Sequence, residues 1–273
     1  LNAGTAAQQA ALLPGIADGG VVATLAGTED DGNWDGSTTT TRATRNGDGW
    51  VLDGHKSFVI DGLGADLLVV LARGEAGLSL FTVAGDAAGL GKRALTVLDP
   101  TRKLARLTFS ATPARLLGTE GGAAEPFART MLEAAVCLAN EMVGGADRLR
   151  EDSLAYAMMR MQFGRQIASF QSMKHKCADM LLEVELAKSA AYYAAAALDD
   201  GDADVAASAS IAKAAASDTY TQTAIHAVQI HGGIGFTWDN DTHLWFKRAK
   251  ASEVMFGDAH HHREKMLAAM EQA

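Results

Sequence analysis

The residues whose types and spacing are best suited to binding an anion lie between Arg160 and Gln171, at a break between two long helical patterns. Arg160 and Arg165 stand on either side of Phe163, and Gly164 interrupts the run. A guanidinium group pairs with phosphate through parallel N–H donors, and backbone N–H groups at a helix N-terminus favour negative charge. Such a corner suits a phosphate group. From these residues alone, the plainer interpretation of a helix–helix loop with solvated arginines is favoured.

A second glycine-rich stretch ends a later helical pattern and reads His231-Gly232-Gly233-Ile234-Gly235. Glycine lets the backbone approach a ligand closely, because it has no Cβ atom. Taken alone, this pattern indicates the end of a helix more often than a nucleotide site. Its meaning therefore depends on the motifs around it.

Three consecutive histidines, His260, His261 and His262, form another group with metal-binding chemistry. Consecutive residues of a helix point about 100° apart, so these three side chains cannot converge on one ion. A solvated helix face is the favoured interpretation. We predict no metal site.

The elements that must position these residues fall into two regions. From Val21 to about Gly118, apolar residues recur with the period of two that is typical of strands, and the frequent glycines favour a barrel or a sandwich. Beyond Glu120, apolar residues recur at steps of three and four, which indicates amphipathic helices. We expect an α+β protein with a β-barrel-like domain followed by a C-terminal four-helix bundle. The expected domains are 1–20 (the end of a helical domain), 21–118 (β-domain) and 119–273 (helical bundle).

Composition excludes several classes of function. The 273-residue chain has a net charge of −9 and a pI near 5.3, which argues against an electrostatic nucleic-acid binder. No apolar run has the length that a bilayer requires, and no signal peptide is recognisable. Cys137 and Cys177 lie in apolar helical patterns, so we expect buried thiols and a cytoplasmic setting. The chain begins without Met, which suggests a truncated or partly ordered product.

Several separated motifs agree in order and spacing: Arg160-x-Gln162-Phe163-Gly164-x-x-Ile167-x-x-Phe170-Gln171, then Ala178-Asp179-Met180, then Ala227-Val228-Gln229-x-x-Gly232-Gly233-x-Gly235-Phe236. Together they closely resemble the acyl-CoA dehydrogenase family. The strand-rich region resembles the family's middle β-domain more loosely. The resemblance also implies an N-terminal helical domain, most of which would lie before Leu1.

In that family, these motifs bind FAD across a subunit interface. The resemblance implies that Arg160 contacts the pyrophosphate and that Phe163 and Gln171 flank the adenosine side. Gln229, Gly232 and Gly233 would hydrogen-bond the dinucleotide.

The region that would face the flavin ring departs from the family pattern. Family members carry Thr-Glu-Pro followed by Gly-Ser, whereas this chain reads Thr28-Glu29-Asp30-Asp31-Gly32-Asn33-Trp34. A Trp-x-Thr segment of the family places a hydroxyl beside the reactive flavin nitrogen, and the matching residues here are Phe58-Val59-Ile60. Ile60 cannot donate that hydrogen bond.

The catalytic base departs as well. Members of the family abstract the substrate α-proton with a glutamate, and Phe256 occupies the matching position. Some members place the base on the first helix of the bundle, where this chain has Ala134 beside Glu133. Glu133 lies about 100° away around the helix, so a structural carboxylate is favoured over a displaced base. Glu141 is another carboxylate in this helical region, and the case for it as the base is weaker still. We therefore predict no catalytic residue in this chain and keep Glu133 as the weak candidate.

These observations predict a subunit of a FAD-dependent acyl-CoA dehydrogenase that supplies cofactor contacts to a homologous catalytic subunit, as a heterotetramer. Relatives with paired subunits oxidise CoA thioesters of steroid side chains, which suggests steroid catabolism. A flavin monooxygenase or oxidase of the same fold is one alternative, and rapid flavin reoxidation by O₂ would favour it. A non-catalytic helical scaffold is another, and the absence of FAD from every preparation would support it.

Overall fold

The computed structural model describes residues 1–202 and 204–271 and divides into two compact units, Leu1–Met131 and Leu132–Ala273. The last strand of the first unit, β7, spans Leu104–Leu117, and the long helix α2 spans Ala124–Met159. The sequence pattern places the domain boundary after residue 118. The first unit extends beyond that boundary because it includes the first turns of α2.

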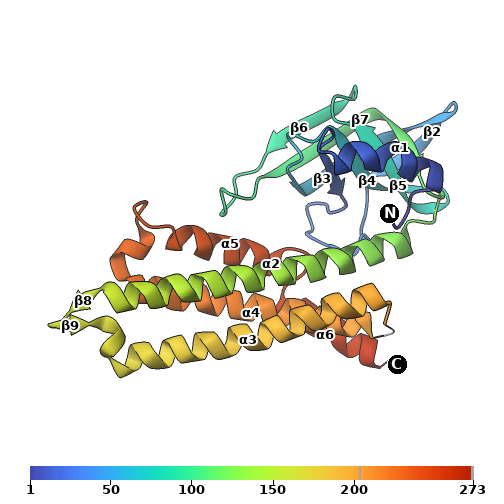
Figure 1. Cartoon of the computed structure of the whole chain (residues 1–273). Coiled ribbons are helices and arrows are strands. Elements are labelled where there is room, and N and C mark those ends of the chain that lie inside the picture. Colours follow the sequence, from blue (N-terminus) through green and yellow to red (C-terminus); the bar gives the residue numbers. More distant parts are fainter. Residues whose placement is uncertain (203, 272–273) are drawn as a thin grey trace. The chain divides into compact units, whose positions relative to one another are not determined.

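The first unit is a closed, barrel-like sheet preceded by a short helix, α1 (Ala6–Ala17) (Figure 1). The hydrogen-bonded strand order is β1-β4-β2-β3-β7-β5; β6 also pairs with β7, and pairing between β4 and β5 closes the sheet. This confirms the predicted barrel-like domain. The remaining strands are β1 (Ala23–Ala26), β2 (Arg42–Asn46), β3 (Gly49–Ile60), β4 (Leu67–Gly74), β5 (Gly77–Ala84) and β6 (Leu90–Ala94).

The core of the barrel follows from alternation along its strands. On β3, Leu52 is fully buried and its two neighbours are more exposed. On β4, Leu68 and Val70 are fully buried and Val69 between them is partly exposed. The β2–β3 hairpin turns at Gly47, whose φ of 61° is readily adopted by glycine, and pairs Asn46 with Gly49.

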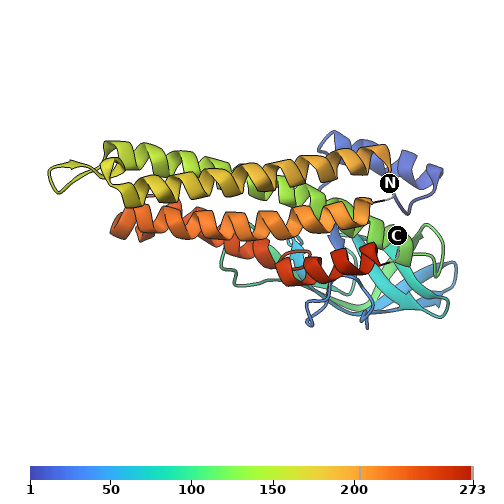
Figure 2. The ribbon, with the colours of Figure 1, turned by 90° about the horizontal axis from the view of Figure 1, so that it is seen from below.

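The second unit is helical and contains the continuation of α2, then α3 (Gln171–Asp200), α4 (Val205–His231), α5 (Thr242–Val254) and α6 (Ala259–Met270) (Figures 1 and 2). Helix α4 packs against α3, α5 and α6. Its many small buried residues let these helices approach it closely. At Gly145 of α2, an added Cβ would lie 2.7 Å from the hydroxyl of Tyr220, so the glycine makes room for that ring. The predicted helical bundle is confirmed.

The last helical segment differs from its expected form as one helix from about Thr242 to Met270. Phe256 and Gly257 have φ angles of 59° and 102°, which a continuous helix does not allow. The carboxylate of Asp258 then accepts a hydrogen bond from the backbone N–H of His261 at 2.8 Å and caps α6. The segment is therefore two helices joined at residues 255–258.

A fully buried lysine holds this junction. Lys213 of α4 donates hydrogen bonds from Nζ to Ser217 Oγ (2.9 Å), to the Glu253 carbonyl (3.2 Å) and to the Gly257 carbonyl (2.9 Å). Burial lowers the pKa of Lys213 to about 8, although the charges of Asp258 and Glu253 oppose that shift. Three acceptors therefore surround a cation that water does not reach.

The expected solvated face of the histidines is wrong for His262, which is 4% exposed and has Nε2 3.0 Å from the Phe256 carbonyl. Burial and the nearby Lys213 lower the pKa of His262 to about 4. The expectation of buried thiols is likewise wrong for Cys137, whose side chain is exposed, while Cys177 is half-buried. Among the described residues, none of the helices has the length and apolar character needed to span a bilayer.

We predict that Lys213→Met removes an alkaline rise in stability. Between pH 8 and 10.5 the unfolded chain keeps the lysine proton that the folded chain has lost, so the free energy of unfolding of the wild type rises with pH, by about 3 kcal/mol from this group. Urea titrations from pH 7 to 10.5 measure the slope, with Lys174→Met on the exposed surface of α3 as control. Equal slopes in Lys213→Met and wild type would contradict this assignment.

Candidate functional site

The corner between α2 and α3 is a short protruding hairpin. The backbone N–H of Arg160 bonds to the Tyr156 carbonyl at 2.8 Å, and the Arg160 carbonyl accepts from Ile167 N–H at 2.9 Å. Between these bonds, β8 (Met161–Gln162) and β9 (Arg165–Gln166) pair around Phe163 and Gly164. Both turn residues have positive φ, 53° and 75°, which is the requirement of a two-residue type I′ hairpin.

Aromatic contacts fix the base of this hairpin. The Phe163 and Phe170 rings meet edge to face with centroids 6.0 Å apart, and the Arg165 guanidinium lies 4.1 Å from the centroid of Phe170. Phe163 is nevertheless 89% exposed, and Arg160 is exposed as well. Arg165 is thus engaged with its own chain, while the guanidinium of Arg160 faces solvent.

The end of α4 lies against the end of α2. The rings of Tyr156 and His231 stack with centroids 4.4 Å apart, and His231 Nδ1 lies 2.8 Å from the Ala227 carbonyl. After His231 the chain enters the 3₁₀ segment η2 (Gly232–Phe236). Gly232 has φ 64° and ψ −143°, and no other atom lies within 4 Å of a Cβ built on Gly232 or Gly233. The backbone at this glycine pair is therefore exposed and open to a ligand.

An apolar cluster of Ala157, Met180 and Ile230, with Tyr156 and Ile167 packed against it, ties these segments together. It brings the predicted cofactor residues to one end of the bundle, next to the β8–β9 hairpin (Figure 1). All six are exposed: Arg160, Phe163, Gln171, Gln229, Gly232 and Gly233. We name this set the bundle-end corner.

The chemistry of the bundle-end corner fits a dinucleotide. It offers one solvent-facing guanidinium, two carboxamide side chains and an exposed aromatic ring. It also offers a pair of glycines, and no neighbouring group fills the space where their side chains would be. A pyrophosphate needs a charged fork donor and close backbone approach, and an adenine ring can stack on an aromatic side chain.

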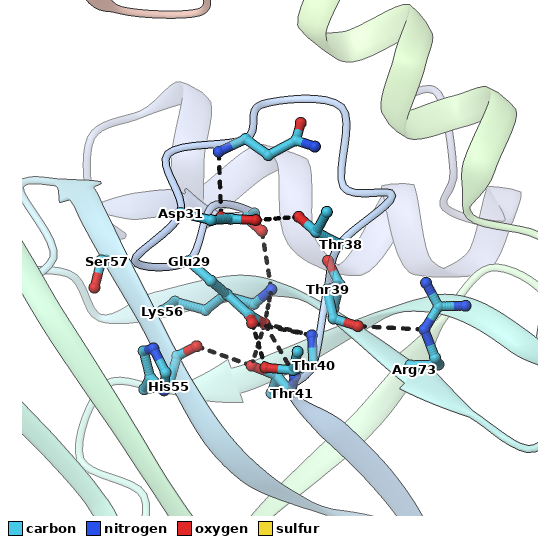
Figure 3. A network of polar contacts seen from close by, with 12 residues as sticks. Glu29, Asp31, Thr38, Thr39, Thr40, Thr41, His55, Lys56, Ser57 and Arg73 are labelled. Carbon is cyan, nitrogen blue, oxygen red and sulfur yellow. Dashed lines mark hydrogen bonds and ion pairs between the residues drawn. The ribbon is translucent and has the colours of Figure 1, made fainter.

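In the first unit, a buried carboxylate anchors the loop that follows β1 (Figure 3). Glu29 accepts hydrogen bonds from the N–H and hydroxyl groups of both Thr40 and Thr41, at 2.5 to 3.1 Å, and from Lys56 Nζ at 2.9 Å. The side chains of Glu29 and Lys56 are 7% and 0% exposed. Burial alone would raise the pKa of Glu29, but the hydrogen bonds from Thr40, Thr41 and Lys56 lower it to about 2. The loop is therefore closed at its base by an ion pair.

The neighbouring Asp30, which stands where the family pattern has Pro, makes a second polar group. It pairs with Arg106, accepts from Ser57 Oγ at 2.5 Å and lies 3.1 Å from His55 Nε2. The hydrogen bonds from Arg106 and Ser57 lower the pKa of Asp30 to about 2. The altered loop thus has partners of its own on β3 and β7.

The remaining predicted positions offer little proton chemistry. Ile60 ends β3 with an aliphatic side chain, and its carbonyl accepts from Thr24 Oγ1 at 2.7 Å. Phe256 is half-buried in the α5–α6 junction. Glu133 lies half-exposed on α2, and Glu141 pairs with Arg248 at 3.0 Å. No group of three or more His, Cys, Asp or Glu within the described ranges is arranged to hold a metal ion.

Sequence reasoning missed the two buried lysines, Lys56 and Lys213. A weak signal was present for Lys213, which is flanked by Ile211-Ala212 and Ala214-Ala215 in an otherwise small-residue helix. For Lys56 the apolar alternation of β3 gave a signal, because the lysine falls in register with the inward-facing Leu52.

A barrel-like sheet followed by a helical bundle is the arrangement of the middle and C-terminal domains in a class of flavin-dependent dehydrogenases. Residues 24–111 match the family model of the acyl-CoA dehydrogenase middle domain, and residues 126–271 match that of the C-terminal domain. The chain belongs to the acyl-CoA dehydrogenase family, whose members are FAD-dependent flavoproteins.

Similarity to individual proteins supports the same family assignment. The chain is 35% identical over 195 residues to acyl-CoA dehydrogenase IpdE2 of Mycobacterium tuberculosis, covering 71% of this chain and 54% of the relative. It is 30% identical over 265 residues to the short-chain specific acyl-CoA dehydrogenase of Megasphaera elsdenii, covering 93% and 69%. A solved variant of the Tcur3481-Tcur3483 steroid ACAD superposes with a TM-score of 0.86 at 32% identity, covering 98% and 72%. The chain thus spans about half to two thirds of its curated relatives.

We predict that Glu29→Gln removes an acid-sensitive part of the stability of the first unit. Since the folded pKa of Glu29 is about 2, against 4.5 when free, the carboxylate stabilises the fold fully above pH 4.5, and this contribution, about 3 kcal/mol, is lost as pH falls towards 2. The measurement is the difference in unfolding free energy between wild type and variant from pH 7 to 2.5. The exposed Glu75→Gln is the control, and a difference independent of pH would refute the prediction.

Proposed function

We propose that this chain is a subunit of a FAD-dependent acyl-CoA dehydrogenase and that it lends its bundle-end corner to the FAD of a homologous catalytic subunit. The observation that carries the proposal is a contrast within the chain. The six residues predicted to bind the cofactor are exposed and lie at one end of the bundle, whereas Phe256 occupies the position at which the family pattern has the proton-abstracting base.

Desaturation of an acyl-CoA removes a proton from the α-carbon and a hydride from the β-carbon. FAD supplies the hydride acceptor when it is bound. The first step needs a carboxylate within hydrogen-bond reach of the α-proton, and the aromatic side chain of Phe256 cannot act as a base. Glu133 is the nearest alternative in sequence to the second base position of the family, and it is displaced by one residue.

The first unit supports the same division of roles. Ile60 offers no hydroxyl at the position expected to face the reactive flavin nitrogen. Asp30 adds a carboxylate, held ionised by Arg106 and Ser57, where the family pattern has an uncharged proline. A negative charge at this place opposes the negative charge that a flavin gains on reduction. These features favour a first unit that does not itself catalyse the desaturation.

The bundle-end corner supports the cofactor role. Arg160 would bind the pyrophosphate, the open backbone of Gly232 and Gly233 would let it approach closely, and Gln229 and Gln171 would supply amide contacts. Phe163, on its hairpin, would lie against the adenosine side. The steroid ACAD at 32% identity supports a CoA thioester of a steroid side chain as the substrate class of the whole assembly.

The proposal is tested by reconstitution. The isolated chain should not desaturate acyl-CoA, because it lacks a base at residue 256, and it should become part of an active complex only with a subunit whose base is intact. The assay is acyl-CoA-dependent reduction of an artificial electron acceptor, with and without the co-expressed subunit. Turnover by a verified assembly of this chain alone would refute the proposal, and Glu133→Gln would then be the variant to examine.

We predict that Arg160→Ala weakens flavin retention by the complex by about 10- to 150-fold, because a charge-assisted hydrogen bond contributes roughly 1.5 to 3 kcal/mol. The readout is the flavin-to-protein ratio after dialysis, which does not depend on turnover. Arg148→Ala, which changes an exposed arginine of α2, serves as the matched control. A flavin content of Arg160→Ala equal to that of the wild type would contradict the assignment of Arg160 to flavin binding.

A further inference from the structure

Three exposed methionines lie together where α2 ends and β8 begins (Figure 1). Met158, Met159 and Met161 are 56%, 73% and 54% exposed. Of the ten methionines, all of which lie among the described residues, the only other exposed one is Met270 at the end of α6, at 63%. We name Met158, Met159 and Met161 the methionine rim.

The methionine rim stands on both sides of Arg160, the residue proposed to bind the pyrophosphate. The N–H of Arg160 bonds to the Tyr156 carbonyl at 2.8 Å, and its carbonyl accepts from Ile167 N–H at 2.9 Å. These two bonds fix the backbone from which the rim projects. A chemical change in the thioethers therefore takes place next to the guanidinium group that the proposed cofactor contact requires.

The surface around the methionine rim is apolar as well. Phe163 is 89% exposed at the tip of the β8–β9 hairpin, and Leu154, one helical turn before Met158, is 37% exposed. Exposed apolar side chains that gather in one patch mark a binding surface. When a ligand or a subunit covers this patch, water is excluded from around Arg160, and a charge-assisted hydrogen bond is stronger where water is excluded. The rim supports such a contact only while it stays apolar.

Methionine differs from other apolar residues because its sulfur can be oxidised. The sulfur lone pair attacks one oxygen of hydrogen peroxide, an S–O bond forms as the O–O bond breaks, and the departing hydroxide takes the remaining proton and leaves as water. Sulfur is oxidised by two electrons, and the peroxide is reduced. The resulting sulfoxide is polar, whereas the thioether is apolar. Its oxygen also accepts hydrogen bonds, so a sulfoxide beside Arg160 competes with a phosphate for the guanidinium donors.

We propose that the methionine rim is an oxidation site that controls the bundle-end corner: conversion of its thioethers to sulfoxides weakens the hold of the corner on its dinucleotide. The inference rests on the cofactor role proposed above and adds a means of regulating that same site. Two effects act in one direction, because the apolar border becomes hydrated and Arg160 gains acceptors within its own chain. Methionine sulfoxide reductases reverse the change, with a dithiol oxidised to a disulfide and the oxygen released as water.

The first test measures which methionines react. The folded full-length chain is treated with hydrogen peroxide, and sulfoxide formation is followed over time by peptide mass spectrometry. The methionine rim and Met270 should react at least about tenfold faster than the fully buried Met142 and Met180, since reactivity follows exposure. Circular dichroism verifies that the treated chain remains folded. A rim that reacts no faster than Met142 would overturn the proposal.

The second test measures flavin retention. The treated chain is freed of peroxide, combined with the homologous catalytic subunit and FAD, and dialysed before the flavin-to-protein ratio is read. Retention should be about tenfold weaker than with the untreated chain, because the apolar burial of at least one methionine side chain is lost. Undiminished retention by a chain with an oxidised rim would show only an adaptable contact surface and would overturn the proposal.

A matched pair of variants assigns the effect to the rim. In the triple variant Met158→Leu, Met159→Leu and Met161→Leu, leucine keeps the apolar volume but cannot be oxidised. Peroxide should leave the flavin retention of this variant at its own untreated value. Met270→Leu removes an exposed methionine elsewhere and should lose flavin on treatment as the wild type does. Equal losses in the triple variant and the wild type would overturn the proposal.

A reduction step separates the methionines from the thiols. Cys137 is exposed and also reacts with peroxide. Dithiothreitol alone reduces sulfenic acids and disulfides but leaves methionine sulfoxide intact, so it should not restore flavin retention. Dithiothreitol together with the two methionine sulfoxide reductases, one for each epimer, should restore it. Full recovery with dithiothreitol alone would assign the effect to cysteine and would overturn the proposal.

The oxidation site and the proposed function fail in different ways. A complex that loses flavin in Arg160→Ala but keeps it after oxidation of the rim would overturn the oxidation site and leave the proposed function standing. A complex that loses flavin on oxidation, but not in Arg160→Ala, would contradict the role of Arg160 and leave the oxidation site standing. A complex that keeps its flavin in both cases would overturn both.

Discussion

Close packing around α4 is the constraint on which the helical unit depends. Alanine and serine make up most of its buried residues, and residues such as Ala212, Ala216 and Ala224 are almost fully buried. Small side chains let neighbouring helices approach, so the shapes of opposing surfaces must match closely. Gly145 illustrates this, because even a methyl group there would collide with Tyr220. The end of α4 is held in the same way, and its position in turn sets the position of Gly232 and Gly233.

Where the chain leaves regular structure, buried cations take over from helix packing. Lys56 binds Glu29 and the Gly27 carbonyl at the base of the first loop, and Lys213 binds two carbonyls at the α5–α6 junction. Both lysines are fully buried. Each fixes backbone next to a residue that departs from the family pattern, Asp30 in one case and Phe256 in the other. The backbone frame of these segments is therefore set by groups other than the residues that would do chemistry.

Much of the architecture was accessible from the sequence. Period-two alternation located the strands, and Ala-rich spacing of three and four located the bundle, because both patterns follow directly from which face is buried. The break at residues 255–258 was missed because a phenylalanine gives no local sign of positive φ, and tertiary hydrogen bonds from Lys213 and His262 impose that conformation. The burial of His262 depends on α4, which lies far away in sequence. The corner residues were predicted from the resemblance of their motifs to the family, whereas the openness of the backbone at Gly232 required coordinates.

The two-residue turn at the tip of the β8–β9 hairpin has a consequence for the entropy of binding. Phe163 and Gly164 both hold positive φ angles, and the Phe163 side chain is 89% exposed. The pairing of β8 with β9 and the edge-to-face contact with Phe170 limit the conformations of this tip before any ligand is bound. A ligand that docks against Phe163 therefore meets a surface that is already ordered, and less of its contact energy is lost to the ordering of a loop.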